Sequence, residues 1–204
     1  MKTEEEIKNK IKIKDYTIYL DECGAGPLCG DLVICGLVLP KDHKIVGIND
    51  SKKISAQKRE KLYPEIIKTA IDYCLVYISP SEVDRLNIFR ARMEGFKKAI
   101  EGITKIKADY AIIDGNKMPI NIAIEADCLI KGDEKIEGIG AASIIAKVTR
   151  DKQMVEAAKI YPQYGLENHK GYGTKEHLEA LKKHGPIDNF HRFSYKPVKN
   201  SVKK

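Results

Sequence analysis

Acidic side chains stand at the carboxyl ends of three predicted strands, the place where open α/β sheets bind their ligands. In chain order they are Asp21 with Glu22, then Asp114, then Asp133. Carboxylates that separate strands deliver to one place repel one another unless a cation neutralises them. Hard oxygen ligands of this kind suit Mg²⁺ or Mn²⁺. The pattern therefore predicts a divalent-metal site at the carboxyl ends of these strands.

The basic composition of the chain adds a second indication of its chemistry. The sequence holds 36 Lys and Arg against 29 Asp and Glu, a formal net charge of +7. Basic side chains can hold a phosphodiester backbone while metals activate water and stabilise the leaving oxygen, so phosphodiester cleavage fits both features. Two alternatives stay open. A single strand-end Asp is often a turn former or helix cap, and a lysine-rich protein need not bind nucleic acid.

A glycine-rich segment follows the first acidic pair. Its spacing from Gly24 to Gly30 is GxGxxxG, and a β-prone run follows it instead of a helix, which disfavours a dinucleotide-binding loop. We predict a tight turn whose amides can approach a substrate beside Asp21. Neighbouring strand side chains point to opposite faces, so Asp21 is favoured over Glu22 as the stronger ligand.

The elements that must position these residues follow from hydrophobic patterning. Strands are expected at 16–22, 31–39, 72–79, 108–114 and within 126–133. Helices are expected at 56–71, with Ser55 as N-cap and Pro64 as a kink or break, and at 81–101, 139–161 and 174–185. The tail from His191 is expected to be irregular. Three successive strands and then strand–helix alternation predict a mixed sheet covered by helices.

Several classes of protein are disfavoured. No run approaches the ~20 apolar residues of a membrane span, and residues 1–14 contain no apolar signal region. The five cysteines form no CxxC pair, and Cys29, Cys35 and Cys74, which lie in apolar runs, are expected to be buried free thiols in a reducing compartment. We therefore expect a cytoplasmic protein with no membrane partner.

Six segments, taken together and in order, resemble the type 2 ribonucleases H, the ribonuclease HII group. They are 18–30 (IYLDECGAGPLCG), 48–60 (INDSKKISAQKRE), 112–119 (IIDGNKMP), 131–151 (KGDEKIEGIGAASIIAKVTRD), 169–178 (HKGYGTKEHL) and 191–198 (HRFSYKPV). The resemblance covers nearly the whole chain. The chain is similar to the single-chain bacterial form of these enzymes.

The resemblance implies a ribonuclease H-like fold with a five-stranded mixed sheet, flanking helices and a C-terminal helical extension. We expect an N-terminal arm at 1–14, the catalytic domain at 15–160 and the extension with its basic tail at 161–204. The implied activity is metal-dependent cleavage of RNA in RNA–DNA hybrids and on the 5′ side of single ribonucleotides in duplex DNA. It leaves 3′-hydroxyl and 5′-phosphate ends, and a monomer is expected.

The resemblance also implies roles for individual residues. The family's catalytic and metal-binding acids, which hold two Mg²⁺ or Mn²⁺ ions, fall on Asp21, Glu22, Asp114 and Asp133. Substrate contacts fall on the turn Gly24, Ala25 and Gly26, on Lys52 as a phosphate contact, on Tyr172 beside the sugar, and on Arg192. From the residues alone, Tyr172 is equally well explained as a half-buried loop residue.

The glycine turn departs from the family pattern. The family has Gly-Arg-Gly, whereas Ala25 replaces the arginine in this chain. A lost charged hydrogen bond typically costs about 1.5–3 kcal/mol, or roughly 10- to 100-fold in affinity. A catalytically weakened hybrid-binding protein on the same fold is therefore the alternative function, and a nuclease acting on DNA alone is a third. Phe193 similarly replaces a tail arginine.

Other polar residues are assigned no functional role. Asp151 is expected to pair with basic neighbours on its helix. His177 and His184 are expected on a helix surface, and neither they nor His169 show metal-ligand spacing.

Overall fold

The computed structural model describes residues 14–202 and contains a five-stranded sheet in the order β3-β2-β1-β4-β5. The strands are β1 (Thr17–Cys23), β2 (Leu32–Val38), β3 (Asp72–Ile78), β4 (Tyr110–Asp114) and β5 (Glu125–Leu129). All five predicted strands are confirmed, with ends shifted by a few residues. The expected arm at 1–14 falls almost wholly outside the described residues.

The sheet is antiparallel on one side of β1 and parallel on the other. β1 pairs antiparallel with β2, which pairs antiparallel with β3. On its other side β1 pairs parallel with β4, and β4 pairs parallel with β5. This is the predicted mixed sheet. The parallel part brings the carboxyl ends of β1 and β4, with Asp21 and Asp114, to the same end of the sheet.

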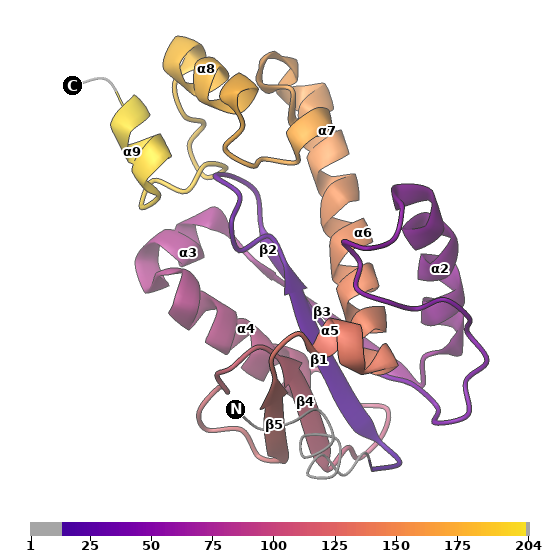
Figure 1. Ribbon diagram of the computed structural model, residues 1–204. Coiled ribbons are helices and arrows are strands. Elements are labelled where there is room, and N and C mark those ends of the chain that lie inside the picture. Colours follow the sequence, from indigo (N-terminus) through magenta and orange to yellow (C-terminus); the bar gives the residue numbers. More distant parts are fainter. Residues whose placement is uncertain (1–13, 203–204) are drawn as a thin grey trace.

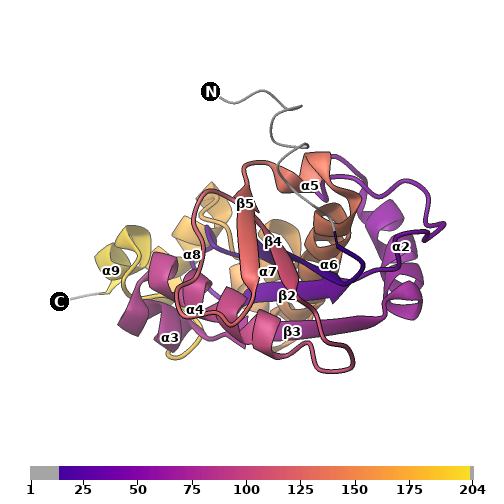
Figure 2. The same ribbon diagram turned by 90° about the horizontal axis from the view of Figure 1, so that it is seen from below.

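Helices cover both faces of the sheet (Figures 1 and 2). They are α2 (Ala56–Thr69), α3 (Pro80–Leu86), α4 (Ile88–Glu101), α5 (Gly132–Lys135) and α6 (Glu137–Ile160). Val33, Cys35 and Leu37 of β2 pack under α6 and α2, whereas Leu32 and Ile34 pack with α4. The period-2 alternation of β2 thus buries both of its faces, which explains its continuous apolar sequence.

The prediction of a single helix over 81–101 is wrong, because the structure contains two helices there. Asn87 adopts a left-handed backbone with φ 65° and separates α3 from α4. Its side chain accepts a hydrogen bond from the Arg90 backbone and so caps the second helix. Pro64, by contrast, lies inside α2 without dividing it. Ser55 caps α2 as predicted, since its hydroxyl accepts from the Lys58 backbone at 3.2 Å.

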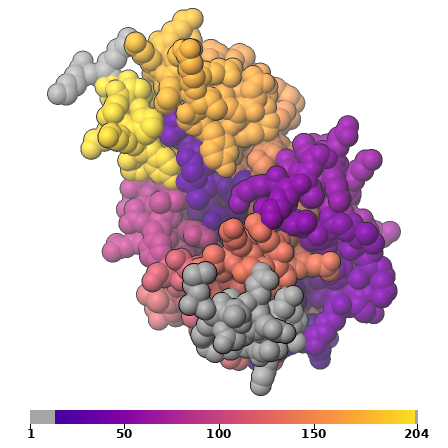
Figure 3. Space-filling model, viewed as in Figure 1, coloured from indigo at the N-terminus to yellow at the C-terminus, as the bar shows by residue number. Residues whose placement is uncertain are grey.

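Short C-terminal elements pack beside the end of α6 and the glycine turn. They are η1 (Pro162–Tyr164), α7 (Leu166–His169), α8 (Lys175–His184) and α9 (Lys196–Ser201). The described part of the tail, expected to be irregular, therefore contains a helix. Figure 3 shows a hollow between these segments, in orange and yellow, and the purple segment that includes α2, with indigo β1–β2 residues at its base. None of the described helices has the length and apolar composition needed to cross a bilayer.

Candidate functional site

The two acids at the end of β1 lie on opposite faces of the sheet. Asp21 is 5% exposed and accepts a hydrogen bond from Ser143 on α6. Glu22 faces the other way, and its Oε1 lies 2.9 Å from Nε of Arg92 on α4. The second Glu22 oxygen, Oε2, is buried without a hydrogen-bond partner. An unpartnered buried carboxylate oxygen is costly unless a ligand completes it.

Two further acids complete the cluster from the parallel side of the sheet. Asp114 ends β4, and its Oδ1 accepts a hydrogen bond of 2.7 Å from the Gly132 backbone. The same turn places Asp133 at the start of α5, where it is 7% exposed. Asp133 therefore belongs to a short helix and not to the end of a strand. Arg92 also donates to the Asp114 carbonyl at 3.1 Å and so contacts both strands that carry the acids.

The electrostatics indicate that these carboxylates share one site. Burial, and then the charges of Glu22 and Asp114, raise the pKa of Asp21 well above its usual value. Burial and the charge of Asp114 raise the pKa of Asp133 to about 6. Burial also raises the pKa of Glu22, although Arg92 opposes that shift. The cluster therefore holds too little positive charge, and its oxygen donors fit a hard divalent cation.

Lys52 lies beside the acids on the loop that precedes α2. Partial burial lowers the pKa of its amine, but the charges of Asp133 and Asp21 outweigh that effect and raise it. Asp50, which sequence reasoning missed, is 6% exposed, accepts a hydrogen bond from the Lys52 backbone at 2.8 Å, and contributes to the raised pKa of Asp133. Arg59 of α2 braces the same loop by donating to the Ser51 and Ile54 carbonyls.

Two buried arginines hold the glycine turn. Arg192 is 0% exposed and donates to the carbonyls of Ala25, Pro27 and Gly30 at 2.8–3.2 Å. The Arg192 side chain therefore holds the turn in shape and is not exposed for the expected substrate contact. Arg150 of α6 is also fully buried and donates to the carbonyls of Asp31, Lys170 and Cys29 at 2.9–3.0 Å.

The glycine turn lies directly beside Tyr172. Gly24 has φ +103°, and a Cβ on it would lie 2.3 Å from Nε of Arg150. Gly26 is exposed, and a Cβ there would lie 3.5 Å from the Tyr172 ring. Tyr172 is 44% exposed. The structure thus brings the predicted residues Gly26 and Tyr172 together on one accessible surface, while Ala25 is half-buried next to them.

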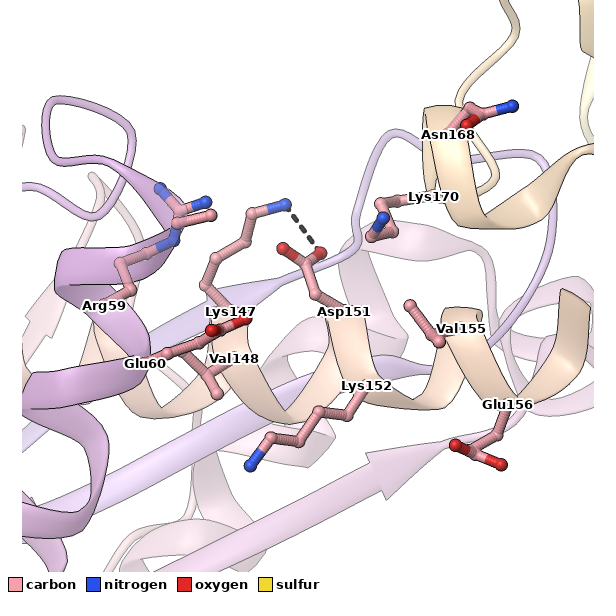
Figure 4. Close-up of a pocket in the computed structure, with 11 residues that line it drawn as sticks. Arg59, Glu60, Lys147, Val148, Asp151, Lys152, Val155, Glu156, Asn168 and Lys170 are labelled. Atoms are coloured by element: carbon pink, nitrogen blue, oxygen red, sulfur yellow. Dashed lines mark hydrogen bonds and ion pairs between the residues drawn. The ribbon is translucent and has the colours of Figure 1, made fainter.

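A pocket of about 490 Å³ lies between α2, α6 and the segment around Lys170 (Figure 4). Lys147 ion-pairs with Asp151 at 2.8 Å across one helical turn, which confirms the expected local pairing of Asp151. Lys152, which also lines the pocket, lies over the Tyr63 ring. The pocket begins one helical turn beyond Ser143, the partner of the first acid.

Several residues of this region gave no usable sequence signal. Arg92 and Ser143 sit in helices whose pattern indicates only packing, and long-range contacts bring them to the acids. His177, expected on a helix surface, is 0% exposed. His184 on the same helix is exposed, as expected.

Comparisons with known proteins give a consistent picture. A family model described as Ribonuclease HII matches residues 18–198. A ribonuclease HII of Vibrio vulnificus (strain YJ016) is 46% identical over 183 residues, which cover 90% of this chain and 87% of that protein. A ribonuclease HII of Hydrogenovibrio crunogenus is also 46% identical, over 91% of this chain and 88% of that protein.

Solved structures resemble the fold over nearly the whole chain. The ribonuclease H2 of Pyrococcus horikoshii OT3 matches with a TM-score of 0.78 and 26% identity, covering 91% of this chain and 96% of that chain. A ribonuclease HII from Archaeoglobus fulgidus, solved in complex with PCNA, matches with a TM-score of 0.72 and 27% identity over 92% and 97% of the two chains. The predicted α/β ribonuclease H-like fold is confirmed.

Proposed function

The chain belongs to the ribonuclease HII family and is a type 2 ribonuclease H, and we propose that its four clustered carboxylates form the catalytic centre. The activity that the family comparisons support is endonucleolytic cleavage of RNA in RNA–DNA hybrids. The finer proposal adds cleavage on the 5′ side of single ribonucleotides in duplex DNA, with 3′-hydroxyl and 5′-phosphate products. The observation that carries the proposal is the under-neutralised cluster of Asp21, Glu22, Asp114 and Asp133.

The residues present fit a pair of divalent metal ions, Mg²⁺ or Mn²⁺. The four carboxylates offer hard oxygen ligands, and Oε2 of Glu22 is buried without a partner. When bound, such ions would activate water and stabilise the leaving 3′-oxygen. Ser143 orients Asp21 by its hydrogen bond, and Arg92 holds Glu22 in place. Arg92 does not neutralise the whole cluster, which leaves it ready for cations.

Lys52 is proposed to bind a phosphate of the cleaved strand. Its amine interacts with the charges of Asp133 and Asp21, and the residue is exposed to solvent. A lysine amine next to the metal ligands can neutralise phosphate charge without occupying a ligand position. Arg59 and Asp50 hold the loop from which it extends.

Ribonucleotide recognition is proposed for the surface formed by Gly26 and Tyr172. The ring packs close to a residue without a side chain, so a sugar can approach the backbone and the ring together. The 2′-hydroxyl is the group by which a protein distinguishes ribose from deoxyribose. The pocket beside Lys147 reaches Lys170, two residues before Tyr172, and its four basic side chains outnumber its three acidic ones, which suits the phosphates of the same substrate.

A catalytically weakened hybrid-binding protein is the second candidate. Ala25 stands where the family has an arginine, and the two arginines nearest the turn, Arg150 and Arg192, are fully buried. Neither offers its charge to a substrate. This candidate predicts salt-sensitive binding of hybrids with negligible cleavage.

The deciding experiment supplies Mg²⁺ or Mn²⁺ and three labelled duplexes: one ribonucleotide in DNA, an RNA–DNA hybrid, and all-DNA. Cleavage at the 5′ side of the single ribonucleotide supports the full proposal. Cleavage of the hybrid alone supports the metal centre and removes the junction activity. Binding without cleavage favours the second candidate. Cleavage of the all-DNA duplex would overturn the ribonuclease assignment in favour of a DNA nuclease.

A further inference from the structure

A buried cluster of histidines lies outside the acidic site. Among the residues that the structure describes, one group brings three potential metal-ligand atoms within 4.8 Å of one another: Cys29, His177 and His191. All three residues are buried, and His169 stacks on His177 with ring centroids 4.6 Å apart. The cluster joins the glycine turn, the segment of Tyr172 and the tail, which are far apart in the sequence.

The hydrogen bonds fix where the histidine protons are. The Ile187 backbone N–H, which can only donate, lies 2.9 Å from Nδ1 of His191, so the proton of neutral His191 is on Nε2. That Nε2 donates to Nε2 of His177 at 3.1 Å. The proton of His177 is then on Nδ1, which donates to the Tyr172 carbonyl at 3.0 Å. A continuous relay of neutral imidazoles thus runs from the Ile187 amide to Tyr172.

This proton arrangement argues against a metal ion at the cluster. A metal on Nε2 of His191 would move the imidazole proton to Nδ1, where it would face the Ile187 N–H. Burial also raises the pKa of the Cys29 thiol to about 12, which disfavours the thiolate that a metal would require. The cluster is better satisfied as a hydrogen-bond relay than as a metal site.

A second histidine contact braces the same segment. The Gly171 backbone donates to Nδ1 of His169 at 3.1 Å, and Nε2 of His169 donates to the Tyr164 carbonyl at 2.8 Å. The Leu28 backbone donates to the Gly171 carbonyl at 2.8 Å. The backbone on both sides of the Tyr172 ring is therefore fixed to the glycine turn, while the ring stays accessible.

We propose that the relay of His191 and His177 positions Tyr172 against Gly26 for ribonucleotide recognition. The two histidines are positioning residues, since they touch the Tyr172 carbonyl or each other and not the exposed surface. This inference rests on the proposed role of Tyr172 in junction cleavage. It adds that the discrimination of single ribonucleotides depends on buried neutral imidazoles behind the recognising ring.

The kinetic test compares His177→Leu with His184→Leu, an exposed histidine on the same helix. For His177→Leu we expect kcat/KM at a single-ribonucleotide junction to fall by roughly 10-fold, the effect of one lost hydrogen bond at a buried site. Cleavage of the RNA–DNA hybrid should change less than about threefold, and His184→Leu should change neither. His177→Asn keeps a donor near the Nδ1 position and should recover part of the junction activity.

A double-mutant cycle with Tyr172→Ala separates positioning from general damage. If His177 acts through Tyr172, His177→Leu should cost little more once the ring is gone. Equal losses on both substrates, or additive losses in the cycle, would overturn the proposal.

A spectroscopic test detects the hydrogen-bond relay independently of enzymatic activity. Imidazole ¹⁵N spectra at neutral pH should show the Nδ1–H tautomer for His177 and the Nε2–H tautomer for His191. The opposite tautomers, or stoichiometric Zn²⁺ binding that Cys29→Ala abolishes, would overturn the relay. Should the wild type cleave neither substrate, the proposed function fails, and these spectra still decide whether the relay exists.

Discussion

The acidic cluster and the buried scaffold of the recognition surface, formed by Arg192, His177 and His191, differ in whether their buried polar groups have hydrogen-bond partners. At the cluster, Asp21 and Glu22 are buried with like charges close by, and one Glu22 oxygen has no partner. In the scaffold, the guanidinium and imidazole groups of Arg192, His177 and His191 donate to carbonyls or to one another. The first arrangement is incomplete without cations, whereas in the second both ring nitrogens of each histidine have a partner and only Nε of Arg192 lacks one. The contrast indicates that one region is built to bind and the other to hold a shape.

The sharpest way to break this comparison is Asp114→Asn. If the cluster holds catalytic cations, cleavage should fall by about three orders of magnitude or more, because the several kcal/mol that metal ions supply in the transition state are lost. In metal-free buffer the variant should be no less stable than the wild type, since one of the repelling charges is removed. Single-turnover cleavage and thermal unfolding measure the two effects.

The matched control for that change is Asp109→Asn. Asp109 precedes the same strand, is exposed, and pairs with Lys14 at 3.7 Å. It should retain full activity. A fully active Asp114→Asn protein would show that the cluster is not the catalytic centre.

Arg192→Met should produce the largest loss of stability. It removes donors from three carbonyls, of which Ala25 keeps a hydrogen bond from the Tyr195 hydroxyl. The carbonyls of Pro27 and Gly30 are left unsatisfied, at about 1–3 kcal/mol each before relaxation. We expect the free energy of unfolding, measured in urea at fixed m-value, to fall by about 3 kcal/mol or more. Arg90→Met, at an exposed helix position, should change it by less than about 0.5 kcal/mol. A small loss at Arg192 would mean that the turn holds its shape without the scaffold.

The same contrast explains what the sequence could foretell. The acids Asp21 and Asp114 were predictable because strand ends are local features, read from a β-prone run that stops. Asp133 was expected at a strand end and instead begins α5, since the segment after β5 turns immediately into a helix. The register of β1 and β4, which brings the acids together, is a long-range pairing that the order of the elements did not predict.

The scaffold, by contrast, depends on contacts that no local pattern contains. His177 occupies a polar-looking helix position, yet its hydrogen-bond partner His191 lies fourteen residues away in the sequence. Arg192 was assigned a substrate contact from the family resemblance, and no local pattern shows that its side chain is buried under the glycine turn. The break at Asn87 was missed because a single left-handed residue leaves the hydrophobic period on both sides intact.

Lowering the pH should affect the two regions in opposite directions. Burial, and then the neighbouring His177, lower the pKa of His191 to about 4. His191 of the unfolded chain therefore binds a proton near pH 6.5, whereas His191 of the folded chain stays neutral down to about pH 4. Because the unfolded state binds the proton more readily, the free energy of unfolding falls as the pH drops from 6.5 towards 4. The loss amounts to about 3 kcal/mol for a shift of this size. Asp21 has a raised pKa, so its protonation favours the folded state as the pH falls.

Urea unfolding at about pH 7 and about pH 4.5 tests these signs. The His191→Gln protein should lose less stability between the two pH values than the wild type does. Asp21→Asn in metal-free buffer should lose more, because it lacks the compensating protonation. A pH dependence unchanged by His191→Gln would mean that burial does not keep this histidine neutral in the folded protein.

Restoring the family's arginine by Ala25→Arg sharpens the comparison from the recognition side. A charged hydrogen bond to a phosphate should raise junction cleavage by roughly 10- to 100-fold, since such bonds contribute about 1.5–3 kcal/mol. Cleavage of the hybrid should rise less than about threefold, because the metal ligands are untouched. Ala25→Met provides similar length without charge and should give no gain. No response to Ala25→Arg would remove the reason for considering a weakened protein.

The smallest effect is expected at Lys147, which lines the pocket between α2 and α6. If a substrate phosphate binds in this pocket, it competes with Asp151 for the amine, so the net contribution is modest. Lys147→Gln should weaken hybrid binding by only a few-fold at about 0.1 M salt and lower the slope of log K against log salt by about one. Lys97 is the matched control, because it also ion-pairs across one helical turn, with Glu101 at 3.9 Å, but lies on α4, outside the pocket lining. Lys97→Gln should leave the slope unchanged. Equal slopes for both variants would confine recognition to the surface between Gly26 and Tyr172.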